Sequence, residues 1–121
     1  MKRFSAGVAE SIGAIKYLYI RCGEHRFVPI WVVVTEGRVL VRSWNDKPSG
    51  WYRAFLEHPI GAIQVDGKEI RVRAIPVGSE KLSAAAEAGY TRKYTTKPNE
   101  KYVKGFATPK RRETALELVP V

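Results

Sequence analysis

Apolar and polar residues alternate over short stretches in much of the chain, which is the pattern of half-buried β-strands. Strands are predicted over residues 16–22, 38–44, 60–65, 69–77 and 115–120. The segment 27–35 (FVPIWVVVT) is almost entirely apolar instead, and this predicts a central strand buried on both faces. Glu36-Gly37 and Asp66-Gly67 fall between such strands, so we expect a tight hairpin at each pair.

Three stretches place apolar residues at the three- and four-residue intervals of a helix. They are residues 5–15, 50–58 and 79–94. Ser5 and Ser49 are the predicted N-caps of the first two, because a serine hydroxyl can accept from a free N–H at a helix start. The polar segment 95–112 contains two prolines and is predicted to be a loop with at most a turn or two of helix.

The order of these elements predicts the fold class. Strands follow one another through tight turns, whereas a parallel sheet would need a crossover helix between most strand pairs. We therefore expect an α+β protein that is mainly antiparallel β, a small and partly open barrel with two or three short helices. A chain of 121 residues is expected to form a single domain over residues 1–121.

The composition indicates in which cellular compartment the protein is expected. Hydrophobic residues make up 45% and charged residues 27%, as in ordinary globular proteins. Cys22 is the one cysteine, which excludes an internal disulfide and fits a reducing compartment. No apolar run reaches the roughly 18 residues that indicate a membrane-spanning helix. We expect a cytoplasmic protein without a membrane partner.

The net charge of +9 is concentrated in residues 90–112, which hold eight Lys and Arg residues against a single Glu. This segment is either a solvated surface or a basic face for phosphate, nucleic acid or another acidic partner. Tyr90, Tyr94, Tyr102 and Phe106 lie among the cations. Such aromatic rings could stack on nucleic-acid bases, but we favour a loop that packs them on a dimer partner.

The chain has few residues that could catalyse a reaction without a bound cofactor. His25 and His58 are the only histidines, and with one cysteine they cannot form a zinc site of ordinary spacing. The chain has no HExxH, GxSxG or P-loop motif, so a hydrolase or metalloenzyme is disfavoured and no metal site is predicted. No catalytic residue is assigned. If the protein is an enzyme, a bound cofactor carries the chemistry.

The turn between strand 38–44 and the second helix holds the candidate ligand-binding residues. It combines cations that could reach a phosphate, hydroxyl groups and flat tryptophan rings for stacking. The candidates are Arg42, Ser43, Trp44, Asn45, Lys47, Ser49, Trp51, Tyr52 and Arg53. The alternative is that these aromatic residues close one barrel end and the arginines are surface charges. If Arg42 contacts a ligand, Arg42→Ala is expected to cost ligand affinity more than folding stability.

The run PIWVVVTEGRVLVRSWNDKPSGWYRAFLEHPIGAIQVDGKEIRVRAIPV resembles a family of uncharacterised bacterial proteins with a flavin-binding split-barrel fold. The segments YTRKY and LELVP resemble the end of that family, so the likeness covers about 29–120. More distantly, the chain is similar to deazaflavin-dependent nitroreductases and to the pyridoxamine-phosphate-oxidase superfamily. It departs from the deazaflavin enzymes in carrying Gly23-Glu24-His25-Arg26 where they have a TTxGRxSG stretch.

This resemblance implies a split β-barrel of the FMN-binding type that forms a homodimer. It also implies flavin mononucleotide or deazaflavin at the subunit interface, and hence an oxidoreductase. The positions that match the ring-proximal loop are Arg42, Ser43, Trp44, Asn45, Ser49, Trp51 and Tyr52. Two alternatives remain: a cofactor-free binding or dimerisation module of the same fold, and a basic barrel that binds nucleic acid.

Overall fold

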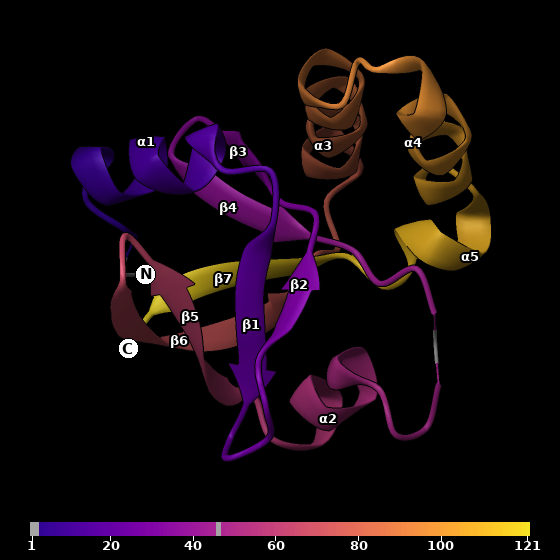
Figure 1. Ribbon diagram of the computed structural model, residues 1–121. Coiled ribbons are helices and arrows are strands. Elements are labelled where there is room, and N and C mark those ends of the chain that lie inside the picture. The colour runs from indigo at the N-terminus through magenta and orange to yellow at the C-terminus, as the bar shows by residue number, and fades with distance from the viewer. Residues whose placement is uncertain (1–2, 46) are drawn as a thin grey trace.

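Seven short strands pair antiparallel into one curled sheet across the part of the chain that the computed structural model describes, residues 3–45 and 47–121 (Figure 1). The strands are β1 (Leu18–Cys22), β2 (Val28–Ile30), β3 (Val33–Thr35), β4 (Arg38–Val41), β5 (Ile60–Val65), β6 (Lys68–Pro76) and β7 (Leu116–Pro120). Their order in the sheet is β2-β1-β5-β6-β7-β4-β3. The protein is therefore an α+β half-barrel of mainly antiparallel strands, as its sequence predicts.

Local backbone chemistry fixes the two predicted hairpins. Asp66 and Gly67 have φ angles of 50° and 75°, and Glu36 and Gly37 have the same pair of values. A type I′ turn needs a positive φ at both central residues, which is why glycine stands second in each. Both hairpin predictions are confirmed, with β5 paired to β6 and β3 paired to β4.

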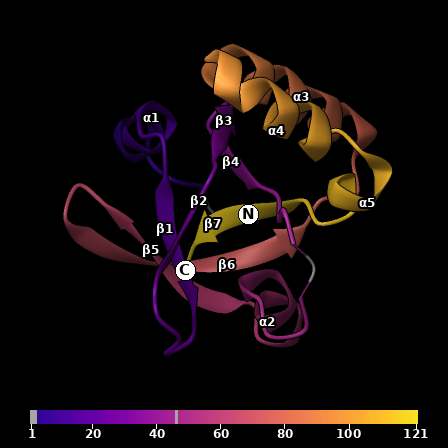
Figure 2. The same ribbon diagram turned by 45° about the vertical axis from the view of Figure 1, so that its right-hand side comes forward.

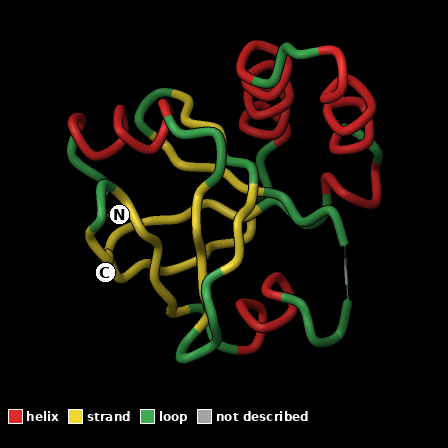
Figure 3. Tube along the Cα trace, in the orientation of Figure 1, coloured by secondary structure: helices red, strands yellow, loops and turns green. Residues whose placement is uncertain are grey.

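The prediction of one central strand over 27–35 is wrong. The segment breaks at Trp31 and Val32, and its halves β2 and β3 form the two opposite edges of the sheet (Figure 3). Pro29 cannot donate a ladder hydrogen bond, so its place in an edge strand is consistent with its chemistry. Because one short segment supplies both edges, the sheet must curl until those edges meet, which is how the half-barrel closes.

The barrel core is filled by aliphatic side chains from the strands and from two helices, α1 (Ala6–Ala14) and α2 (Trp51–Glu57). The Ser5 hydroxyl accepts from the Val8 N–H at 3.3 Å, which confirms the predicted cap of α1. The N-cap of α2 is Gly50, so the prediction of Ser49 is wrong by one residue. Phe55 of α2 is buried against Gly61, where a Cβ would lie 2.1 Å from the Arg21 carbonyl oxygen.

A second layer of helices stands beside the barrel at the β3 edge (Figure 2). It consists of α3 (Glu80–Lys93), a 3₁₀ turn (Lys97–Asn99), α4 (Glu100–Phe106) and α5 (Pro109–Arg112). The prediction of a loop over 95–112 is wrong, because Pro98 and Pro109 lie in the first turns of these helices, where proline is favoured. The described residues thus hold more helices than the two or three expected.

The Tyr94 hydroxyl forms hydrogen bonds with the main chain at the break between β2 and β3. Its oxygen accepts from the Val32 N–H at 3.1 Å, and the hydroxyl donates to the Lys16 carbonyl at 2.7 Å. The Lys93 ammonium donates to the Val32 carbonyl at 2.7 Å. Val32 is fully buried, so main-chain groups that no strand partner reaches are paired by the end of α3.

Burial shifts the pKa values of Lys93, the last residue of α3, and of Tyr94, which follows it. It lowers the pKa of Lys93 from 10.5 to about 8 and raises the pKa of Tyr94 to about 12.

Among the described residues, no helix has the length and apolar character needed to cross a bilayer.

Removing the Tyr94 hydroxyl should destabilise the barrel. Tyr94→Phe leaves the buried Val32 N–H without a partner, so the free energy of unfolding should fall by about 1–3 kcal/mol. Urea denaturation measures this change. Tyr19→Phe is the control, because Tyr19 is exposed and its hydroxyl has no hydrogen bond within the described residues. Equal stability of the two variants would contradict the role assigned to Tyr94.

Lys93 should make stability rise with pH between about 8 and 10. In the folded state, burial disfavours the charged form of Lys93, whereas Lys93 of the unfolded chain stays protonated up to its normal pKa. In this window the unfolded chain therefore binds more protons, and raising the pH favours folding. Above pH 10 the raised pKa of Tyr94 acts in the opposite direction. Lys93→Met should flatten the increase, as measured by denaturation at a series of pH values. An unchanged pH profile in the variant would contradict this assignment.

Candidate functional site

The candidate site begins where β4 ends, at Val41 rather than at the predicted residue 44. Beyond Val41 the main chain leaves the β4–β7 ladder, and the Thr114 side chain takes over the pairing. The Thr114 hydroxyl accepts a hydrogen bond from the Ser43 N–H at 2.8 Å and donates one to the Arg111 carbonyl at 2.7 Å. The Ser43 hydroxyl donates to the Asn45 carbonyl. This side-chain pairing directs residues 42–50 away from the sheet, toward α2.

Arg42 is the largest fully buried side chain in the described part of the protein, with 2% of its surface exposed. Its guanidinium donates to the Phe106 carbonyl at 2.7 Å, the Ser83 carbonyl at 3.1 Å and the Glu87 carboxylate at 3.3 Å. It thereby joins the end of β4 to α3 and to α4. Its Nε–H is buried without a hydrogen-bond partner.

Positive charge exceeds negative charge around Arg42. The Glu87 carboxylate is shared with Arg112, whose Nε lies 2.7 Å from the same oxygen that accepts from Arg42. Arg112 also contacts Glu80 at 2.9 Å, but the Glu80 side chain is 86% exposed and its charge is largely screened. One partly buried carboxylate therefore faces two guanidinium groups.

Trp44 is held between Arg111 and α4. The Arg111 guanidinium lies 3.6 Å from the centre of the indole ring and donates from Nε to the Trp44 carbonyl at 3.0 Å. On the other side, a Cβ at Gly105 would lie 2.4 Å from the indole, so only glycine permits this contact. The indole orientation is thus fixed by the protein.

The aromatic residues of segment 90–112 pack within their own chain. Tyr94 stacks on Trp31 at 3.8 Å between ring centres and 2° between planes, and Phe106 stacks on Tyr90 at 5.2 Å. Tyr90, Tyr94 and Phe106 are buried, and burial raises the pKa of Tyr90. The interpretation that this segment packs its aromatic rings on a dimer partner is therefore wrong for these three. Tyr102, 38% exposed, is the exception.

These residues enclose an open cavity of about 460 Å³ between the barrel, the 42–50 turn and α4. The volume lies within the usual range for small-molecule sites, roughly 300–1,000 Å³. Six of its fourteen wall residues are aromatic and five are polar or charged. They are formed by Tyr17, Pro29, Ile30, Trp31, Arg42, Ser43, Trp44, Asn45, Lys47, Gly50, Trp51, Asn99, Tyr102 and Phe106.

Six of the nine predicted site residues come together at this cavity: Arg42, Ser43, Trp44, Asn45, Lys47 and Trp51. Ser49 lines a smaller cavity next to it. Tyr52 packs against the barrel core, with its hydroxyl 3.4 Å from the Glu113 carbonyl, and Arg53 is on the exposed side of α2. Asp46, inside the predicted turn, lies outside the described residues.

The remaining wall residues come from segments that the sequence analysis assigned to other roles. Tyr17, Pro29 and Trp31 were assigned to strands, and Trp31 lines the cavity because the chain breaks there. Asn99 and Tyr102 belong to the segment expected to be a loop. The placement of Tyr102 among basic residues was the one available sign, since a ring exposed among cations is typical of ligand surfaces.

No three His, Cys, Asp or Glu side chains of the described residues form a group that could hold a metal ion. The cavity is lined by the cationic side chains of Arg42 and Lys47, by two amides and by aromatic rings. These groups suit a planar organic anion rather than a metal cation. The arrangement can orient such a ligand and stabilise negative charge on it.

The chain belongs to a bacterial family described as "Uncharacterized protein conserved in bacteria (DUF2255)", whose sequence profile matches residues 10–118. A solved structure with a similar fold is the conserved hypothetical protein Rv2991 from Mycobacterium tuberculosis, with a TM-score of 0.58 and 11% identity. That match covers 98% of this chain and 83% of the other. At this identity the likeness concerns the fold alone. No curated protein matches the sequence.

Replacing Arg42 should unfold the site rather than only empty it. Arg42→Met removes the buried donor to the Phe106 and Ser83 carbonyls and one of the two cations beside Glu87, so the free energy of unfolding should fall by about 3 kcal/mol. This outcome differs from the sequence-based expectation, in which ligand affinity suffers more than stability. The matched control is Arg92→Met on the exposed surface of α3, expected to stay within about 0.5 kcal/mol of the wild type. Urea denaturation compares them, and a stable Arg42→Met protein would contradict the structural role.

Proposed function

We propose that this protein binds a flavin or deazaflavin cofactor in the aromatic cavity and acts as an oxidoreductase of the FMN-binding split-barrel type. The observation that carries the proposal is the wall itself. Trp31, Trp44 and Trp51 converge there from β2's end, β4's end and α2, around a buried cation. Fixed flat rings and a fixed positive charge are what an electron-accepting, planar, anionic ring system requires.

The residues present fit such a ring. The indole of Trp44 is fixed by Arg111 and Gly105, and the indole of Trp31 is fixed by its stack on Tyr94, so neither must be ordered when a ligand binds. Asn45 and Asn99 place amide groups at the cavity, where they could pair with the ring's carbonyl and imide groups. The cavity therefore offers stacking and edge recognition together.

Arg42 is suited to favour the reduced, anionic form of the ring. Its unpartnered Nε–H belongs to a buried guanidinium that lines the cavity and whose carboxylate partner is shared with Arg112. A buried donor without a partner is costly, and an acceptor on a ligand would relieve that cost. Lys47 adds a second, exposed cation at the mouth.

The bound flavin or deazaflavin would supply the hydride or electron chemistry, which explains why no acid–base pair is needed from the protein. The protein would orient the ring, exclude water from one face and hold positive charge beside it. These roles match the described residues that line the cavity, since no carboxylate or histidine is among them.

A homodimer is part of the proposal, with the second copy covering the cavity mouth. Tyr17, just before β1, and Tyr19 of β1 are 47% and 46% exposed, and Tyr19 pairs with the exposed Pro29 of β2. Together with Tyr102 they form an apolar surface at and beside the open side of the cavity, of the kind that marks interaction sites. A dimer at micromolar concentration in sedimentation would support this, and a monomer would contradict it.

Binding is tested by titrating flavin mononucleotide, riboflavin and a deazaflavin into the purified protein. A saturable change in cofactor absorbance and quenching of tryptophan fluorescence are expected. The absence of any saturation up to millimolar cofactor would contradict the proposal and favour a cofactor-free module of the same fold.

A matched pair of tyrosine variants locates the ligand. Tyr102→Ala should weaken flavin binding about 2- to 10-fold, because it removes one exposed aromatic wall of the cavity. Tyr19→Ala removes a similarly exposed ring that does not line the cavity, and the monomer's affinity should be unchanged. Affinities measured at concentrations below dimer formation separate the two effects. Equal losses in both variants would place the ligand elsewhere.

A further inference from the structure

A second, smaller cavity adjoins the aromatic one. Its volume is about 170 Å³, and the two cavities share Gly50 and Trp51 as a common wall. Its remaining lining comes from β1, the turn that follows it, and the start of α2: Arg21, Cys22, His25, Arg26, Ser49 and Ala54. It is smaller and more polar than its neighbour, so it suits a compact charged group rather than a ring.

The charge of this small cavity is positive. Arg26 is exposed and forms no ion pair within the described residues. Arg21 contacts Glu69 through one terminal nitrogen at 3.0 Å, while its Nε is buried and has no hydrogen-bond partner. Ser49 contributes a hydroxyl that forms no hydrogen bond within the described residues. The arginine guanidinium matches the geometry of phosphate and can donate two hydrogen bonds to it, and a hydroxyl can donate another.

Among the described residues, no carboxylate lines the small cavity. The nearest acidic influence is that of Glu57, which together with burial raises the pKa of the Cys22 thiol. Cys22 is itself 3% exposed and donates to the His58 carbonyl at 3.1 Å, so it offers an approaching ligand no charge. The cavity therefore attracts an anion through Arg21, Arg26 and Ser49.

Arg42 is poorly placed to bind a phosphate, although its sequence position suggested that role. Three of its five N–H groups already donate to Phe106, Ser83 and Glu87, which holds the guanidinium in place and leaves Nε–H as its one nitrogen without a partner. A phosphate needs several donors at once, and the Arg42 guanidinium is already shared among three protein acceptors. The free donors on the other side of Trp51 belong to Arg26 and Ser49.

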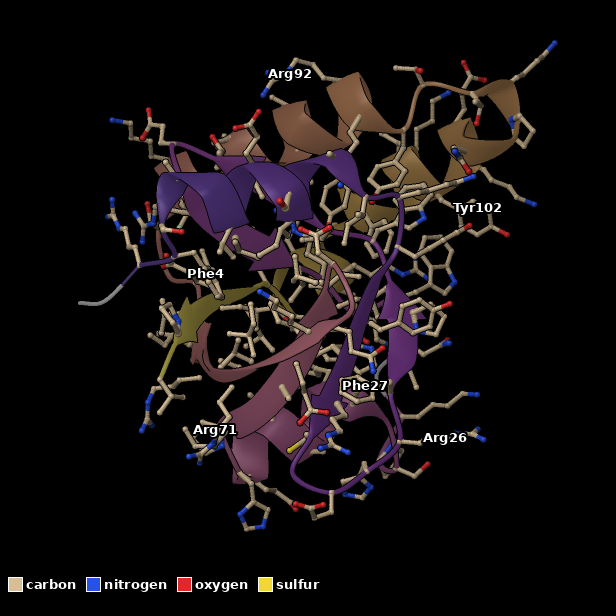
Figure 4. The ribbon with its side chains drawn as sticks, turned by 60° about the vertical axis from the view of Figure 1, so that its left-hand side comes forward. Phe4, Arg26, Phe27, Arg71, Arg92 and Tyr102 are labelled. Atoms are coloured by element: carbon tan, nitrogen blue, oxygen red, sulfur yellow. The ribbon has the colours of Figure 1, made fainter. Side chains whose placement is uncertain are left out.

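We infer that the small cavity is an anion subsite, which binds the phosphate of a ligand whose aromatic ring occupies the larger cavity. The inference rests on the proposed function for the ring and adds the ligand class: a phosphorylated aromatic compound such as flavin mononucleotide, in preference to its unphosphorylated form. In Figure 4, Arg26 and Tyr102 lie on the same side of the molecule. Arg26 lines the small cavity and Tyr102 lines the large one.

The test compares two ligands that differ only in the phosphate. Flavin mononucleotide should bind the wild-type protein more tightly than riboflavin. Arg26→Ala should weaken flavin mononucleotide about tenfold and leave riboflavin unchanged, because only the phosphate loses a charge-assisted bond. Arg92→Ala is the matched control: it removes the same charge from an exposed position on α3, and both affinities should be unchanged. Equal affinity of the two ligands for the wild type, or equal losses in Arg26→Ala, would overturn the subsite.

A second measurement keeps the subsite testable if no flavin binds. Inorganic phosphate is titrated into the full chain, and backbone amide shifts are followed by NMR. Shifts at residues 24–26 and at Ser49 that saturate in the wild type and vanish in Arg26→Ala would support the anion subsite. Their absence would overturn it, whatever the flavins do. Phosphate shifts without flavin binding would instead reject the proposed function and leave the subsite standing.

Discussion

The two main-chain polar groups of Val32 are the constraint on which the rest of the structure depends. They lie at a buried break between two edge strands, where no neighbouring strand can pair them. An unpaired buried N–H or carbonyl is costly, so the barrel can close only if another element supplies partners. Tyr94 and Lys93 do so, and the end of α3 is thereby placed against the barrel wall.

Placing α3 also places the site. Trp31 stacks on Tyr94 and turns toward the cavity, and α4 follows α3 closely enough that the Phe106 carbonyl meets the Arg42 guanidinium. Arg42 then joins the end of β4 to both helices from inside. The aromatic wall is therefore not an independent feature added to a barrel. It is the surface that results when the break in the barrel is closed by a tyrosine and the end of β4 by an arginine.

Features governed by neighbouring residues could be predicted from the sequence, and features governed by distant partners could not. The Asp66-Gly67 turn and the Ser5 cap depend on local backbone chemistry. The break at Trp31 depends on a tyrosine 62 residues away from Val32, and the apolar run around it has the periodicity of a single strand. Prolines that begin a short helix were interpreted as marks of a loop.

The candidate site follows the same division. The turn after β4 was identifiable because cations, hydroxyls and tryptophans lie together in it. The burial of Arg42 was not, since its partners Ser83, Glu87 and Phe106 are 41 to 64 residues away. The opposite cavity wall comes from a segment whose aromatic residues could equally have faced a partner chain.

The position of β7 determines the order in which this protein can be built. Leu116–Pro120 lies between β6 and β4 in the sheet and is hydrogen-bonded to both. Until those residues leave the ribosome, the strands already made can form two separate β units, a four-stranded one and a hairpin, which residues 31–32 and 42–59 connect along the chain. Pairings this distant in sequence form slowly. The sheet can therefore close only after residue 120 has been synthesised, and until then the edges of β4 and β6 are left without their strand partner.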